Sequence, residues 1–172
     1  MNYLSGLVTW FVGLFRGVGS TQPAAVPEVP AVESVGEPED RPEQLTPHFH
    51  LDEFMCADGT PVPDNLYLAV RELAENLEVL RARVDRPVTI ISGFRTGAYN
   101  KRIGGAAKSQ HLAAAAADVK VKGYSPKRLA ALIAELIEEG VMKKGGVAEY
   151  PAFTHYDIRG KNVRWSGTRR AS

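Results

Sequence analysis

A proline-rich stretch divides the chain and limits how much of it can fold as one unit. Residues 20–46 carry proline at positions 23, 27, 30, 38 and 42, among alanine, valine, glutamate and serine. Such a segment buries too little apolar surface to offset its ordering entropy, and proline favours extended geometry. We therefore predict a semi-rigid linker over 20–46 and one small folded domain over 47–172.

Residues 1–19, ahead of this linker, are strongly apolar between positions 3 and 18. The uninterrupted apolar run ends at Arg16 and is shorter than the roughly 20 residues that a membrane-spanning helix needs. We predict that residues 3–18 form a helix with few contacts to the domain. This helix could be the core of an export signal, a weak membrane anchor, an interfacial helix or a segment that docks on a partner protein.

Charge and cysteine content exclude several kinds of site. The formal net charge is +1, so charge alone indicates no polyanionic partner, and we expect no nucleic-acid binding. Cys56 is the single cysteine of the sequence. An intramolecular disulfide is therefore impossible, and a zinc site built on cysteines can be set aside.

The folded part mixes helices and short strands. Apolar residues recur at helical spacing over 63–84, and the segment 125–140 starts with Ser-Pro and stops at glycine, so both predict helices. We expect strands in five places: 87–92, 117–121, 147–150, 153–159 and 163–165. Because the last three strands follow one another through tight turns, we predict an α+β fold with a small, mostly antiparallel sheet flanked by helices.

Histidine and aspartate provide the residues most suited to chemistry. His111 and Asp118 stand seven residues apart, on either side of five alanines. His155 and Asp157 lie two apart on one predicted strand, so their side chains leave the same face. His111, Asp118 and His155 form a set of two histidines and one carboxylate, which suits a zinc site with an open fourth position. Iron and other metals also bind such a set.

Three ordered motifs resemble those of the M15 family of zinc peptidases. They are Ser-Gly-Phe-Arg-Thr at 92–96, Ser-x-His with a following Ala-x-Asp at 109–118, and His-x-Asp at 155–157. The resemblance covers roughly residues 47–167. Within the family, the sequence is most similar to the short bacterial and phage members. It implies an M15/hedgehog-like peptidase domain that acts as a D-Ala-D-Ala carboxypeptidase or an L-alanyl-D-glutamate endopeptidase on peptidoglycan stem peptides.

The resemblance also assigns roles to single residues. It makes His111, Asp118 and His155 the ligands of Zn²⁺. It makes Arg95 the residue that binds a substrate carboxylate, which suits the planar guanidinium, and Ser109 a further substrate contact. The implied reaction is hydrolysis by a water molecule that zinc activates, with a nearby carboxylate as general base.

The sequence departs from the family pattern at two positions. Ala152 stands where many relatives carry the acidic base, three residues before the third ligand, and Ala114 stands where glycine is usual. Glu149 and Asp157 are the remaining candidates for the base. We favour Glu149, which the turn at Pro151 could swing over the metal, and expect Asp157 to fix an imidazole instead.

Two functions therefore stay open. The first is a zinc metallopeptidase that cuts peptidoglycan stem peptides, as a carboxypeptidase or an endopeptidase such as an endolysin. The second is a weak or inactive relative that serves as a structural or cell-wall-binding module, for example in a phage particle. We expect a periplasmic or extracellular protein, with residues 3–18 as a candidate tether to a membrane or partner and a virion-associated location as the alternative.

Overall fold

The computed structural model describes residues 43–167, and their elements alternate between short strands and helices. In chain order they are β1 (Gln44–Thr46), β2 (Phe49–His50), η1 (Leu51–Phe54), η2 (Asp64–Leu66), α1 (Tyr67–Val84), β3 (Val88–Ser92), α2 (Gly97–Arg102), η3 (Gln110–Ala113), β4 (Ala116–Val121), α3 (Pro126–Glu138), β5 (Gly146–Glu149), β6 (Thr154–Asp157) and β7 (Val163–Ser166). The predicted segment 3–18 lies outside the described residues. No helix within residues 43–167 has the length and apolar character needed to cross a bilayer.

The main sheet has five strands in the order β3-β4-β6-β5-β7. The first three pairings are antiparallel, and the last, between β5 and β7, is parallel. With its flanking helices this sheet confirms the predicted α+β fold and its mostly antiparallel character.

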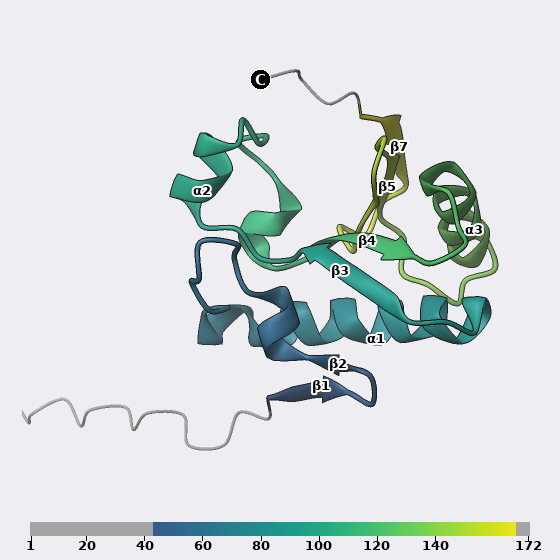
Figure 1. The fold of residues 1–172 in the computed structure, drawn as a ribbon, viewed down its shortest axis with the longest axis horizontal. Helices are drawn as coiled ribbons and strands as arrows, with labels where there is room; N and C mark the ends of the chain where they lie inside the picture. The colour runs from purple at the N-terminus through teal and green to yellow at the C-terminus, as the bar shows by residue number, and fades with distance from the viewer. Residues whose placement is uncertain (1–42, 168–172) are drawn as a thin grey trace, which may run out of the picture. The chain divides into compact units, whose positions relative to one another are not determined.

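Two helices cover the sheet because each has one apolar face. The helix α1 buries Val70, Leu73, Leu77 and Leu80 completely, at the helical spacing that predicted it. It lies between the five-stranded sheet and the small sheet of β1 and β2 (Figure 1). The helix α3 packs against β5 and β6 and begins as predicted, with the Ser125 hydroxyl accepting from the backbone N–H of Arg128 at 3.2 Å.

One part of the predicted linker is folded. Residues 44–46 form β1, which pairs with β2 and contacts α1. The Thr46 hydroxyl donates to the Glu78 carboxylate on α1 at 2.7 Å, and this carboxylate also accepts from the backbone N–H of His48. These partners are distant in sequence, so the local composition of the segment could not reveal the strand.

The alternation of side chains gives the main sheet two different faces. On β4, Ala117, Val119 and Val121 belong to the hydrophobic core, which also contains the buried side chains of α1 and α3. Asp118 lies between them in the sequence and therefore projects from the opposite face. This opposite face carries the candidate site.

Candidate metal centre

Three residues meet on the sheet face that the core helices leave open. Asp118 on β4 and His155 on β6 are direct cross-strand partners, so their side chains leave the sheet side by side. His111 comes from the turn η3, which leads into β4. All three residues are at least 94% buried, and their candidate donor atoms lie within 4.8 Å of one another.

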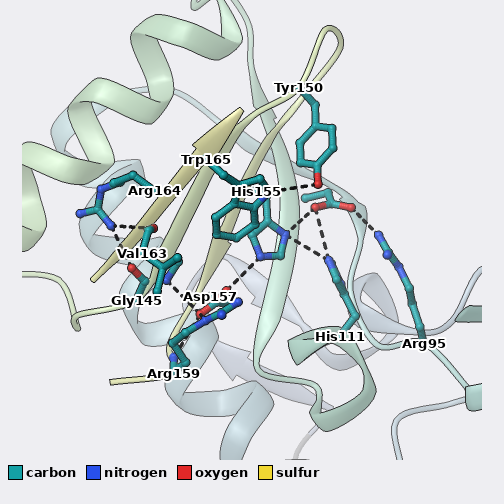
Figure 2. Close-up of polar contacts among 12 residues, drawn as sticks. Arg95, His111, Gly145, Tyr150, His155, Asp157, Arg159, Val163, Arg164 and Trp165 are labelled. Carbon is teal, nitrogen blue, oxygen red and sulfur yellow. Dashed lines mark hydrogen bonds and ion pairs between the residues drawn. The ribbon is translucent and has the colours of Figure 1, made fainter. Parts of the chain in front are cut away.

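The spacing of the three donor atoms suits a single metal ion. His111 Nε2 lies 3.2 Å from His155 Nδ1 and 3.3 Å from Asp118 Oδ1, and His155 Nδ1 lies 2.9 Å from Asp118 Oδ1. Two ligands bound tetrahedrally at 2.0–2.1 Å stand about 3.3 Å apart. The triangle is therefore close to one face of a zinc coordination tetrahedron (Figure 2).

Hydrogen bonds behind each imidazole select the nitrogen that faces the centre. His111 Nδ1 lies 2.6 Å from the carbonyl oxygen of Gly93, and His155 Nε2 lies 3.1 Å from the Asp157 carboxylate. Both partners are acceptors, so these two nitrogens carry the protons in the neutral rings. The other two nitrogens then direct lone pairs at each other, an arrangement that a cation stabilises. The donor set therefore fits a divalent metal.

The protonation of the cluster without metal agrees with this arrangement. Burial lowers the pKa of His111, which favours its neutral form. Burial alone would also lower the pKa of His155, but hydrogen bonds to Asp118 and Asp157 raise it above its ordinary value. Burial would raise the pKa of Asp118, yet its hydrogen bonds with the two histidines bring it well below the usual range. A metal ion would replace the proton that His155 holds.

The segment Ser92–Arg95 wraps around His111 and Asp118. A side chain on Gly93 would lie 2.6 Å from the backbone of Phe54, so only glycine fits, and its carbonyl holds the His111 ring. The backbone N–H of Arg95 donates in return to the carbonyl of His111 at 3.0 Å. This mutual contact explains why the first motif must accompany the ligands.

Arg95 lies directly beside the candidate metal ligands. Its Nη2 donates to Asp118 Oδ2 at 2.5 Å, and its Nε donates to the Ser92 hydroxyl at 3.0 Å. The third guanidinium nitrogen, Nη1, makes no hydrogen bond to protein within residues 43–167, so it is available to another acceptor. Arg95 thus holds Asp118 in place and keeps one nitrogen without a hydrogen bond beside the cluster.

Asp157 lies behind His155, on the far side of the ring from the metal position (Figure 2). Its carboxylate accepts from Arg159 Nε at 2.7 Å, from Arg159 Nη2 at 2.6 Å and from the backbone N–H of Gly146 at 3.0 Å. Burial would raise the pKa of Asp157, but its bonds with His155 and Arg159 hold it well below the usual range. In this position Asp157 can orient the imidazole of His155. It is poorly placed to act as the general base, because the ring lies between it and the metal position.

Within residues 43–167, Ser109 and Ala114 make no side-chain hydrogen bond to the cluster, although the backbone N–H of Ala114 donates to the carbonyl of His111 at 3.2 Å. Ser109 is half-buried at the start of η3, two residues before His111. Ala114 adopts a left-handed φ of 51°, the conformation that a glycine would take more easily. The turn after η3 therefore holds an alanine in a left-handed conformation that is strained for a residue with a side chain.

Glu149 projects from the other face of the sheet. On β5 it pairs with Thr154, whereas its neighbour Ala148 pairs with His155. Alternation therefore directs Ala148 to the ligand face and Glu149 to the face that α3 covers. This register does not support the sequence-based preference for Glu149 as the base.

We expect the Glu149→Gln variant to hydrolyse substrate at a rate within about twofold of the unmodified protein. The substitution keeps the size of the side chain, and removing a carboxylate on the far face should leave the general-base step intact, although such a step is typically worth 10²–10⁴-fold. Steady-state assays of the two zinc-loaded proteins check this. A loss of turnover with zinc still bound would restore Glu149 as the base.

Sequence reasoning missed three side chains around the cluster. Arg159 follows Asp157 at strand spacing, so alternation could have indicated it. The indole of Trp165 lies with its ring centre 5.2 Å from that of His155, and its Nε1 donates to the Tyr150 hydroxyl at 3.3 Å. Trp165 reaches this position through the parallel pairing of β7 with β5, which no local pattern reveals.

The cluster and the family match together define a class of protein. A buried set of two histidines and one carboxylate that could hold a metal ion, in an α+β domain that matches a peptidase family, is that of a metallopeptidase-type domain. The model of the Peptidase M15 family matches residues 47–157, a range that contains all three residues of the cluster, and the chain belongs to this family. A comparison with curated proteins finds no match.

Proposed function

We propose that the domain hydrolyses peptide bonds in peptidoglycan stem peptides and that its metal is Zn²⁺. The observation that carries this proposal is the convergence of three donors with fixed tautomers beside the free Nη1 of Arg95. His111, Asp118 and His155 would hold the ion and leave one position open. When bound, zinc supplies a Lewis acid and lowers the pKa of water.

Family membership and the position of Arg95 support the proposed substrate class. Peptidoglycan stem peptides carry carboxylates close to the bonds that M15 carboxypeptidases and endopeptidases are expected to cut. A guanidinium next to the metal ligands would pair with such a carboxylate and orient the scissile amide. Both bond types fit this geometry, so the reaction products decide between them.

Purified peptidoglycan tests this function directly. The zinc-loaded full chain should release fragments, and a chelator should stop the release until zinc is added back. Mass spectrometry then distinguishes free D-alanine, the product of a carboxypeptidase, from new D-glutamate amino termini, the product of an endopeptidase. Fragment release that is unaffected by metal removal would contradict a metallopeptidase.

A second candidate function is a wall-binding module with little or no turnover. The observation in its favour is that Ala152 replaces the usual acidic residue while Glu149 lies on the other face. The same assay separates the two functions. Zinc-dependent retention of the protein on insoluble peptidoglycan, without any released fragment, would favour the binding module.

The proposed substrate also implies a place of action outside the cytoplasmic membrane. We propose that residues 3–18 tether the domain there, through a membrane or a partner protein. Fractionation of cells that produce the full chain checks this proposal, and recovery of the protein in the cytoplasmic fraction alone would contradict it.

A further inference from the structure

Tyr150 follows the last residue of β5 and lies on the ligand face of the sheet. It is two residues beyond Ala148, which is the cross-strand partner of His155. Side chains two apart on an extended chain leave the same face, so Tyr150 accompanies His155 while Glu149 does not. The bond between its hydroxyl and Trp165 confirms this side, because Trp165 also pairs with Ala148.

The phenol ring is held firmly on both sides. Its ring stacks on that of Phe153 at a centroid distance of 4.6 Å and an interplanar angle of 18°. A side chain on Gly167 would lie 1.9 Å from the Tyr150 ring, so the bare backbone of Gly167 lies against it. The ring therefore has little freedom, and the hydroxyl group stays near the indole.

The hydroxyl has one hydrogen to donate. Indole Nε1–H only donates, so the phenol oxygen of Tyr150 accepts from Trp165. No acceptor for the phenol hydrogen is recorded within the described part of the chain. A hydroxyl that already accepts a hydrogen bond is polarised and donates more strongly.

This donor points toward the metal cluster. The indole that holds it lies against the His155 ring, at a centroid distance of 5.2 Å and an angle of 50°. Figure 2 shows the hydroxyl end of Tyr150 directed toward the region between His155 and Arg95. The guanidinium of Arg95 and the polarised phenol of Tyr150 therefore both lie beside the three residues of the cluster (Figure 2).

We infer that Tyr150 is a catalytic residue of the proposed reaction and donates a hydrogen bond to the carbonyl oxygen of the scissile amide. This inference rests on the proposed function. Negative charge develops on that oxygen when water attacks, and a donor that is already positioned stabilises it at no further cost in reorganisation. Such a donor complements the carboxylate-binding Arg95, since the two groups contact different parts of the substrate.

The Tyr150→Phe variant removes this hydrogen bond and keeps the ring contacts with Phe153 and Gly167. We expect kcat on peptidoglycan fragments to fall about tenfold, as for the loss of one net hydrogen bond, with KM changed less than twofold and one zinc still bound per chain. Tyr124→Phe is the matched control, because Tyr124 stacks under Arg128 outside the cluster. An unchanged kcat in Tyr150→Phe overturns the inference.

Binding of acetohydroxamate separates this inference from the proposed function. The compound is a small ligand of metal sites that presents a carbonyl oxygen, and calorimetry on the zinc-loaded full chain measures its affinity without any turnover. We expect Tyr150→Phe to weaken binding about fivefold to tenfold, and Tyr124→Phe to leave it unchanged. If the unmodified protein cleaves no peptidoglycan, the proposed function fails, and this titration alone decides the role of Tyr150. Equal affinity in the two tyrosine variants, or no binding by the unmodified protein, overturns the role.

Discussion

Replacing His111 with alanine is expected to abolish hydrolysis and to remove stoichiometric zinc from the protein. A structural zinc site contributes about 10–16 kcal/mol of binding free energy over four ligands, so one ligand is worth roughly 3 kcal/mol, or more than 100-fold in affinity. Among residues 43–167, His111 is also one of the three side chains that form the cluster. Metal analysis after dialysis and an assay on peptidoglycan measure the two effects.

A control must separate loss of metal from loss of fold, because His111 is buried and also holds Gly93. Asp118→Asn keeps the shape of its side chain and removes the ligand charge, so it should lose zinc with less disturbance of the core. His50→Ala changes an exposed histidine outside the cluster and should keep both zinc and activity. Full zinc occupancy in His111→Ala at unchanged affinity would show that the ion binds elsewhere.

The fold class and the candidate ligand set could both be predicted from the sequence, but for different reasons. Helices such as α1 and α3 follow from apolar spacing and from the Ser125-Pro126 start, which are local properties. The ligand set came from the resemblance of the motifs, since types and spacing alone do not bring His111 to β6. The structure explains their meeting through the direct pairing of Asp118 with His155.

The face of Glu149 could not be read from the sequence. We expected the turn at Pro151 to swing this carboxylate over the metal. In the structure the backbone N–H of Tyr150 donates to the carbonyl of Phe153, and Glu149 still pairs with Thr154, so strand alternation continues up to the turn. One residue of register decides the face, and that register depends on contacts between strands.

The strand β1 and the residue Trp165 were missed because their partners are distant in the chain. β1 has only three residues, and Glu78 on α1 fixes it through Thr46. Trp165 reaches His155 across Ala148, whose small side chain leaves room for the indole on the ligand face. Neither arrangement has a local sequence pattern, so only the tertiary structure reveals it.

The Asp157→Asn variant should lose both metal affinity and stability. An amide can still accept from His155 Nε2, but it no longer increases the basicity of the ring, and changes of this kind typically weaken metal binding by about 10–100-fold. The variant also leaves the Arg159 guanidinium without its carboxylate, to which it donates at 2.7 and 2.6 Å. Since Arg159 is partly exposed, we expect the free energy of unfolding to fall by about 2–3 kcal/mol.

The two effects of Asp157→Asn can be separated by a variant at its partner. Arg159→Gln removes the same ion pair and leaves the Asp157 carboxylate bound to His155 Nε2, so it should lose stability while zinc affinity falls much less. Competition with a chromogenic chelator measures the affinity, and urea unfolding of the metal-free proteins measures the stability. At saturating zinc, Asp157→Asn should recover most of its turnover, because the carboxylate lies behind the imidazole. A variant that binds zinc normally but stays inactive would instead assign Asp157 a direct part in the reaction.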